Sequence, residues 1–222
     1  MTPLPPLDST LAALTGPHAH LAESKGRALR YHVDVAPFVT LVGERDAEAW
    51  ADLAAMAGPG ALVPVADPPA DWEVVEHFAG VQMVAVSPAA APEPAARVLG
   101  PADVPAMLDL VSRAEPGPFR PRTIEMGRYL GIFDGDALIA MAGERLRPPG
   151  WTEISAVCTD PAHRGKGLAT RLVHAVAHGI VERGDHPFLH ASATNTNAIR
   201  LYTALGFELV RHTAFGIART PA

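Results

Sequence analysis

The sequence has little of what marks secreted, membrane-spanning or nucleic-acid-binding proteins. It contains one cysteine, Cys158, which excludes an intramolecular disulfide and suits a reducing compartment. No apolar run approaches the roughly 20 residues that cross a bilayer, and the first residues are rich in proline, without a basic start or an apolar stretch. The formal net charge is −6, and Lys and Arg form no runs that could neutralise a nucleic acid backbone. We expect a cytoplasmic protein whose partners include neither a membrane nor a nucleic acid.

Glycine is concentrated in one short segment, residues 163–170, which reads His-Arg-Gly-Lys-Gly-Leu-Ala-Thr. A strand is predicted just before it, over 151–159, and an apolar helix just after it, over about 168–183. Gly165 and Gly167 leave room for backbone N–H groups to approach an anion, and the start of the helix adds the positive end of its dipole. The segment therefore predicts a site for a phosphate-bearing ligand.

The spacing of residues within this loop distinguishes between the known phosphate-binding motifs. A P-loop requires Ser or Thr after its Lys, but Lys166 is followed by Gly167, and a dinucleotide fingerprint requires a third Gly where Thr170 stands. The order Arg164-x-x-Gly167-x-Ala169 instead resembles the Arg/Gln-x-x-Gly-x-Gly/Ala loop of the GNAT superfamily of acetyl-CoA-dependent acyltransferases. The resemblance makes coenzyme A the first candidate ligand.

A second segment, residues 195–207, resembles the part of GNAT proteins that follows their fifth strand. It begins at Asn195, continues through Ala198 and Tyr202, and closes on Gly206-Phe207. The resemblance covers roughly residues 96–219. It implies an α/β (α+β) fold with a mixed, mainly antiparallel sheet flanked by helices.

A stretch of small residues and prolines divides the chain. We predict an N-terminal α/β domain over 1–88, a linker over 89–95 and a GNAT acetyltransferase domain over 96–222. The smaller first domain is either a degenerate GNAT-like copy or an unrelated cap over the acceptor site. Within it we expect a hairpin around Ala79-Gly80, and near the C-terminus an exposed edge strand over 215–218.

Acetyl transfer to an amine needs a base, an oxyanion donor and a proton for the departing thiolate. The resemblance makes Glu153, on the strand before the loop, the candidate base; the alternative is a carboxylate paired with Arg145 or Arg147. His190, on the strand before the second motif, is the reserve base if Glu153 is paired elsewhere, but a hydrogen-bonded strand histidine is the favoured interpretation. Tyr202 matches the tyrosine that protonates the thiolate in the family, and its alternative is a core residue of the helix.

The remaining site residues are assigned to the cofactor. The strand end offers backbone N–H groups to the thioester and the pantetheine arm, the loop binds the phosphates, and two asparagines bond pantetheine amides or cap the short helix, with capping the stronger claim for Asn197. These residues are Val157, Cys158, Thr159, Arg164, Gly165, Lys166, Gly167, Leu168, Ala169, Thr170, Asn195 and Asn197.

Two other chemical roles, covalent catalysis and zinc binding, are not favoured. Cys158 has no neighbouring His or Asn in the sequence, so a covalent acetyl-enzyme is the lesser alternative. His174 and His178 have the spacing of a zinc pair, but the Glu of that motif is absent because position 175 is Ala. We expect no metal.

The sequence thus predicts transfer of an acetyl or other short acyl group from acetyl-CoA to a primary amine by direct attack in a ternary complex. The alternatives are a CoA- or acyl-CoA-binding sensor or regulatory protein without catalysis, and a phosphate or nucleotide binder. The acceptor is open: Arg120, Arg122 and Arg128 could favour an acidic or carboxylate-bearing acceptor, but arginines near prolines more often form a solvated surface. Both a monomer and a homodimer are compatible with the sequence.

Overall fold

The computed structural model describes residues 4–87 and 90–222, and its dominant feature is one large sheet. Eight strands lie in the order β4-β11-β5-β10-β9-β8-β7-β6. Only β9 and β10 pair in parallel, and every other neighbouring pair is antiparallel. This confirms the expected mixed, mainly antiparallel sheet. The strands are β4 (Leu62–Val65), β5 (Glu73–Ala85), β6 (Arg97–Val98), β7 (Tyr129–Asp134), β8 (Ala137–Glu144), β9 (Trp151–Thr159), β10 (His186–Ser192) and β11 (Phe207–Arg219).

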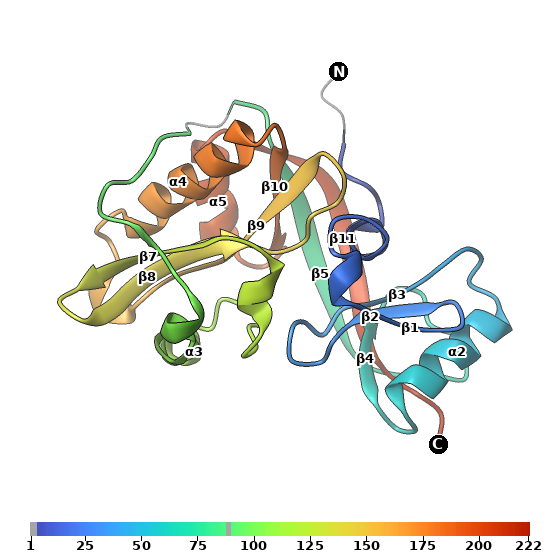
Figure 1. Cartoon of the computed structure of the whole chain (residues 1–222). Coiled ribbons are helices and arrows are strands. Elements are labelled where there is room, and N and C mark those ends of the chain that lie inside the picture. The colour runs from blue at the N-terminus through green and yellow to red at the C-terminus, as the bar shows by residue number, and fades with distance from the viewer. Residues whose placement is uncertain (1–3, 88–89) are drawn as a thin grey trace.

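Helices cover both faces of this sheet (Figure 1). On one face lie α4 (Leu168–Glu182) and α5 (Thr196–Ala204), and on the other lies α3 (Val104–Ala114). None of the helices in residues 4–87 and 90–222 is long and apolar enough to cross a membrane.

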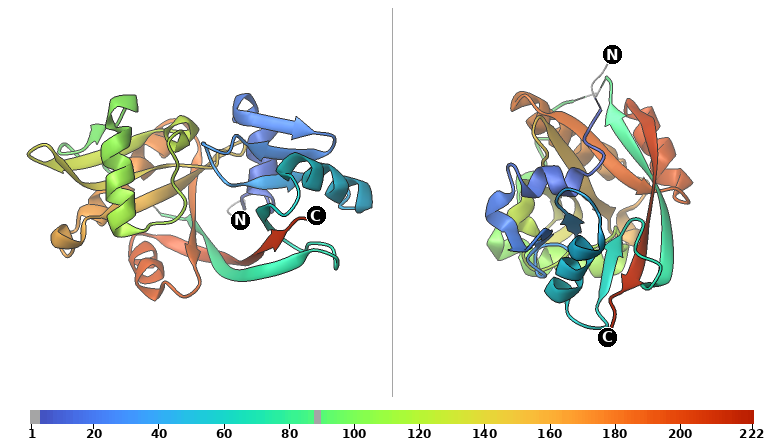
Figure 2. Two further views of the ribbon diagram at one scale, coloured as in Figure 1. Left: turned by 90° about the horizontal axis from the view of Figure 1, so that it is seen from below. Right: turned by 90° about the vertical axis from the view of Figure 1, so that its right-hand side faces the viewer.

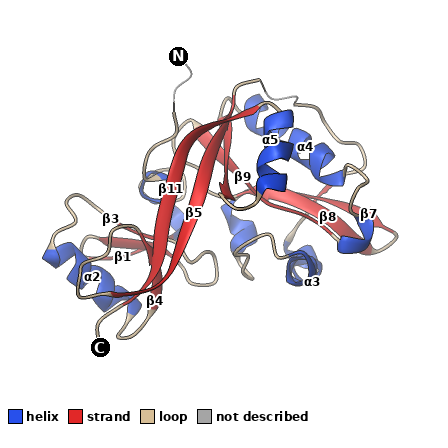
Figure 3. Cartoon of the chain, turned by 180° about the vertical axis from the view of Figure 1, so that it is seen from behind, coloured by secondary structure: helices blue, strands red, loops and turns tan. Residues whose placement is uncertain are grey.

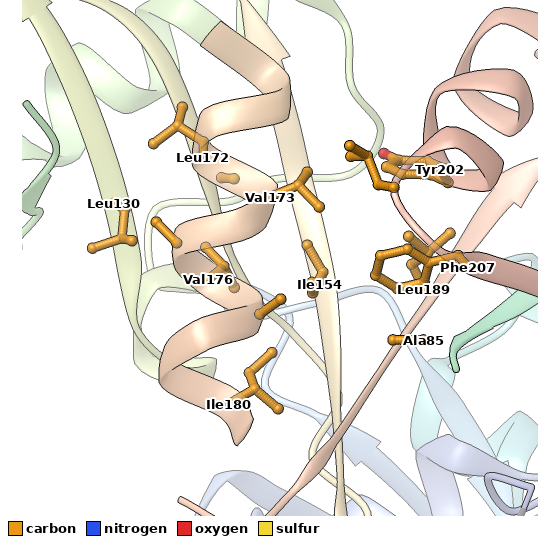
Figure 4. Packing of buried hydrophobic residues seen from close by; sticks show 14 of the residues in the cluster. Ala85, Leu130, Ile154, Leu172, Val173, Val176, Ile180, Leu189, Tyr202 and Phe207 are labelled. Atoms are coloured by element: carbon orange, nitrogen blue, oxygen red, sulfur yellow. The ribbon is translucent and has the colours of Figure 1, made fainter. Parts of the chain in front are cut away.

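The main core lies between α4, α5 and the sheet. On α4 the apolar side chains recur at helical spacing, so that Leu172, Val176 and Ile180 join one core cluster with Leu130 and Ile154 of the strands (Figure 4). Each such side chain, when fully buried, contributes about 1.5–3 kcal/mol. Tyr202 and Phe207 close the same core from α5 and the start of β11. The periodicity of the sequence therefore fixes which face of α4 meets the sheet.

The first part of the chain builds a second lobe and also completes the large sheet. Its own sheet is three-stranded, in the order β1-β2-β3, and a T-shaped contact between Trp50 and Trp72 lies in the adjoining core. Figure 2 shows the long pair β5 and β11 running under both lobes. The elements of this lobe are α1 (Ser9–Leu14), β1 (Ala22–Lys25), β2 (Ala28–Tyr31), β3 (Val39–Leu41) and α2 (Ala47–Ala57).

The predicted domain boundary lies close to this junction. Residues 62–65 and 73–85 precede the expected linker, yet they form β4 and β5 of the large sheet. Residues 88 and 89, at the boundary itself, lie outside the described residues. Whether 1–88 is a domain of its own stays a prediction.

Two local expectations were wrong. No hairpin forms at Ala79-Gly80, because β5 continues through both residues and pairs with β11 along its length (Figure 3). Gly80 instead permits a close approach, since a Cβ there would lie 2.7 Å from Oγ1 of Thr213. The segment 215–218 is not an edge, because β11 lies between β4 and β5.

Candidate functional site

Strands β9 and β10 separate from one another halfway along their length. Their parallel register runs from Trp151 opposite His186 to Ile154 opposite Leu189, and then ends, although β9 continues to Thr159 and β10 to Ser192. Within this part of β9, Ala156 has a φ of 52° and the register with β8 shifts. Such a bulge turns one strand away from its neighbour. The result is an interruption of the backbone pairing in the middle of the sheet, here called the opening, with backbone groups of β9 on one side.

The glycine loop lies at the end of β9 and leads into α4. Gly165 and Gly167 have φ values of 78° and 72°, a region that glycine enters without strain, and a Cβ on either would meet nothing within 4 Å. Gly167 is the N-cap of α4, and no side chain caps this helix start. The first N–H groups of a helix that lack a cap are the groups that bind anions.

A buried hydroxyl adds to this arrangement. Oγ1 of Thr159 is buried and has no hydrogen-bond partner among the described residues, which carries a desolvation cost unless a ligand or water supplies one. It lies at the last position of β9, between the opening and the loop. The open loop, the uncapped helix and this hydroxyl together fit a ligand with phosphates at one end and amides along its arm, as coenzyme A has.

Glu153 is a buried carboxylate that several hydrogen bonds hold in place. It is 0 % exposed. Its carboxylate accepts from Nε and Nη2 of Arg145 at 2.8 and 2.6 Å, and from the backbone N–H of Leu146 at 3.3 Å. Nδ1 of His190 lies 2.7 Å from Oε1. Burial alone would raise the pKa of Glu153, but the charge of Arg145 and the hydrogen bonds from Arg145 and His190 outweigh it and lower the pKa well below its usual range.

His190 lies at the opening itself. It is the first residue of β10 beyond the segment paired with β9, and its side chain is 28 % exposed. Its second ring nitrogen, Nε2, lies 3.1 Å from Nε2 of Gln82 on β5. Oε1 of Gln82 in turn accepts from Nη1 of Arg211 on β11 at 3.0 Å. A row of polar side chains therefore crosses five strands or strand ends from Arg145 to Arg211.

Sequence reasoning missed Gln82 and Arg211. Gln82 is 1 % exposed and lies within the apolar run of β5 between Val81 and Met83. A polar side chain inside a run of buried strand residues needs a partner. That signal was present in the sequence, but the partner was not readable from it.

The first lobe covers this face of the sheet. Oη of Tyr31 lies 2.8 Å from Nδ1 of His18, and the ring of Phe38 lies 5.1 Å from the guanidinium of Arg145. Burial and then the charge of Glu153 raise the pKa of Tyr31. Burial lowers the pKa of His18 to about 4. Residues of the first lobe therefore wall in the Arg145–Glu153 pair.

Tyr202 lies on the opposite side of the sheet, on α5. It is 8 % exposed and its ring makes a T-shaped contact with Phe207, with centroids 6.1 Å apart. Burial raises the pKa of its hydroxyl to about 12. The hydroxyl therefore keeps its proton at neutral pH.

Comparison with known proteins agrees with this geometry. A model of the family described as FR47-like protein matches residues 129–215, which contain the opening, the loop and both helices beside them. A solved structure from Novosphingobium aromaticivorans, described as a putative acetyltransferase from the GNAT family, is 34 % identical, covers 96 % of each chain and superposes with a TM-score of 0.86. The chain belongs to the GNAT family.

Other similar proteins match a smaller part of the chain or match it at lower sequence identity. The curated N-alpha-acetyltransferase RimI of Mycobacterium tuberculosis is 33 % identical over 85 residues, which are 37 % of this chain and 52 % of that protein. The match thus spans about half the length of that relative. A GCN5-related N-acetyltransferase from Kribbella flavida, 17 % identical with a TM-score of 0.62, covers 97 % of this chain and 96 % of its own, and shares its fold.

The structure also places the asparagines, the cysteine and the histidine pair that the sequence singled out. Asn195, not Asn197, is the N-cap of α5, because its Oδ1 accepts from the N–H of Ala198 at 3.0 Å, so the capping prediction for Asn197 was wrong. Cys158 is buried, and burial raises the pKa of its thiol to about 12. His178 lies 3.4 Å from Glu182, and no group of three or more His, Cys, Asp or Glu that could hold a metal occurs in the described residues.

Two of the three arginines considered for the acceptor are already engaged. Arg122 pairs with Glu125 at 2.7 Å, and Arg120 donates to the carbonyl of Val33 in the first lobe. Arg120 also lines a cavity of about 190 Å³ whose other walls come from the first lobe, among them Arg30. The loop 115–122 and the first lobe therefore meet around one hollow.

Proposed function

We propose that this GNAT-family protein transfers an acetyl group from acetyl-CoA to a primary amine by direct attack in a ternary complex. The observation that supports this most is the opening between β9 and β10. It has the glycine loop and the uncapped α4 beyond one strand, and the Glu153–His190 pair at its closed end. A ligand with phosphates at the loop can present a thioester at the opening, beside a base.

The cofactor would be held by the glycine loop, the start of α4 and the end of β9. N–H groups of the loop and of the first turn of α4 would bind the phosphates, and Thr159 and the backbone of β9 would bond the pantetheine arm. When bound, acetyl-CoA supplies an acyl thioester that an amine can attack.

We assign the base to His190, with Glu153 acting through it. Glu153 has both oxygens occupied and a lowered pKa, so it accepts a proton poorly and does not reach solvent. His190 is partly exposed and its Nδ1 bonds to that carboxylate. A carboxylate that is hydrogen-bonded to an imidazole orients the ring and stabilises its protonated form, as the Asp does for the His of a Ser-His-Asp triad. The expectation that Glu153 itself is the base stays a prediction beside this assignment.

The protons balance with two side chains. His190 takes one proton from the ammonium of the acceptor and releases it to solvent at the end of the cycle. The neutral amine that is left forms the new C–N bond as the C–S bond breaks. Tyr202 gives its phenolic proton to the departing thiolate and recovers a proton from the nitrogen as the amide forms. The raised pKa of Tyr202, about 12, keeps that proton available.

The test is thiol release from acetyl-CoA with a panel of primary amines: short peptides with free N-termini, lysine side chains blocked at the α-amine, and polyamines. Acetylated product is identified by mass spectrometry. His190→Ala is expected to lower kcat by about 10²–10⁴-fold, with acetyl-CoA binding retained. His178→Ala, on the exposed side of α4, is the matched control and is expected to leave kcat unchanged.

Tyr202→Phe distinguishes the acid from the base. It keeps the ring that packs on Phe207 and removes only the hydroxyl. We expect a lower kcat with the KM for acetyl-CoA unchanged. Binding of acetyl-CoA with no acetyl transfer to any amine would favour the alternative of a sensor or regulatory protein.

A further inference from the structure

We propose that Gln82 and Arg211 are positioning residues that fix the tautomer of His190 and the orientation of its ring. This rests on the proposed function, because it concerns the base assigned there. Neither residue touches the reacting atoms. Both act through the imidazole.

The three side chains form a straight row across the sheet. In the strand register, Gln82 of β5 is directly opposite His190 of β10 on one side and Arg211 of β11 on the other. The row is held by the bonds of 3.1 Å between Gln82 and His190 and 3.0 Å between Arg211 and Gln82. Nη2 of Arg211 also donates to the carbonyl of Pro5 at 3.4 Å, so the guanidinium is held from a second direction.

The donors and acceptors of this row leave one arrangement. A guanidinium has only donors, so Arg211 requires the oxygen of the Gln82 amide. The NH₂ group of Gln82 then faces His190, and because it only donates, Nε2 of His190 must accept. The proton of a neutral imidazole therefore lies on Nδ1, which donates to Glu153. The lone pair on Nε2 accepts this bond, so it takes a proton from the acceptor amine only when the NH₂ of Gln82 moves aside.

A bulge in β11 creates this row. Leu209 is opposite Met83, and the next pair is Arg211 opposite Gln82, so Val210 is the extra residue. Without it, Val210 would be opposite Gln82 and Arg211 would be displaced from the row, because successive strand residues point to opposite faces. Bulges often re-aim a side chain next to an active site, and this one aims Arg211 at the amide.

The same bonds determine what must happen when Nε2 takes a proton. That proton would face the NH₂ of Gln82, and the amide cannot turn over without setting its NH₂ against Arg211. The NH₂ of Gln82 must therefore move aside when the acceptor amine gives its proton to Nε2.

Gln82→Glu replaces this NH₂ donor by an acceptor with almost no change in shape. A carboxylate at position 82 still accepts from Arg211 but now also accepts from His190, which favours a proton on Nε2. We expect the acid limb of kcat/KM to move to higher pH by about one unit, the size that follows when a hydrogen bond favouring the neutral ring is replaced by one favouring the charged ring. Gln82→Leu, which removes both bonds, is expected to move it less.

The decisive readout is the ¹⁵N spectrum of the His190 ring in the full-length protein, assigned by comparison with His190→Ala. In the wild type at neutral pH we expect a protonated Nδ1 and an unprotonated Nε2. In Gln82→Glu we expect both nitrogens to carry protons over a wider pH range. Arg219→Met, which breaks an exposed pair with Glu73 on the same two strands, is the control and should leave the spectrum unchanged.

An unprotonated Nδ1 in the wild type, or a spectrum that Gln82→Glu does not alter, would overturn the proposal, and neither result depends on activity. The expected spectra without acetyl transfer to any amine would contradict the proposed function alone and support the tautomer assignment.

Discussion

Replacing Arg145 by Met removes the countercharge of a buried carboxylate and keeps most of the side-chain volume. Arg145 makes two hydrogen bonds to Glu153, of 2.6 and 2.8 Å, and Glu153 is 0 % exposed. Breaking a buried pair from one side costs about 3–5 kcal/mol, because an unpaired charge is left in the interior. We expect Arg145→Met to lower the free energy of unfolding by about that amount at pH 7.5.

The cost depends on pH in a direction that follows from Glu153. In the wild type its pKa lies below the unfolded value of about 4.3, so the pair stabilises the protein above that pH and the contribution is lost as the pH falls. In the variant the charge and hydrogen bonds of Arg145 are gone, and burial then raises the pKa. The buried carboxylate now costs stability at neutral pH, and that cost disappears as the group binds a proton at lower pH. The difference between the two proteins is therefore largest at neutral pH and shrinks toward pH 4.5.

The assay is urea unfolding at pH 7.5, 6 and 4.5, followed by both tryptophan fluorescence and circular dichroism so that coincident transitions can be verified. Arg219→Met is the matched control, because its pair with Glu73 is exposed and such pairs contribute about 0–1 kcal/mol. A loss in Arg145→Met no larger than in Arg219→Met, or a difference that grows as the pH falls, would refute the reasoning.

Three further predictions concern the loop, the second motif and the cysteine. Gly167→Ala places a Cβ at a φ of 72°, so it should cost about 1 kcal/mol of stability and weaken acetyl-CoA binding measured by calorimetry. Gly184→Ala, at a φ of 83° beyond the other end of α4, should cost a similar amount of stability and leave binding unchanged. Asn195→Ala should lower the free energy of unfolding by about 1 kcal/mol through loss of the α5 cap, whereas Asn197→Ala should not lower it, and equal losses would contradict the cap assignment. Because burial raises the pKa of the Cys158 thiol to about 12, the thiol should react with a disulfide reagent at pH 8 only after unfolding, and Cys158→Ala should remain active; fast reaction in the native protein would reopen covalent catalysis.

Much of the site could be predicted because its signals are local. The conformation of the loop at 163–170 could be predicted from Gly165 and Gly167, because both adopt the positive φ that glycine allows. The apolar residues after the loop predicted a helix over about 168–183, and α4 spans Leu168–Glu182. The ion pair of Glu153 with Arg145 was foreseen as an alternative, since the two residues are only eight positions apart in neighbouring strands.

What could not be predicted depends on residues far apart in the sequence. Gln82 and Arg211 are 129 positions apart and meet only because β5 lies between β10 and β11 and because β11 carries a bulge. The hairpin at Ala79-Gly80 was wrong for the same reason: the glycine serves the approach of Thr213, which sequence patterns do not reveal. Local rules describe turns and helices well, whereas strand order and register are set by the whole chain.

The most direct test of the account is the melting temperature of the purified protein with acetyl-CoA, CoA or ATP, for the wild type and for Gly167→Ala. A ligand that binds only the folded state at about 100 times its Kd adds about 2.7 kcal/mol. The account predicts a rise of several degrees for the wild type with both CoA compounds, no rise with ATP, and a much smaller rise for Gly167→Ala. No rise with any ligand, or an equal rise with ATP, would contradict it.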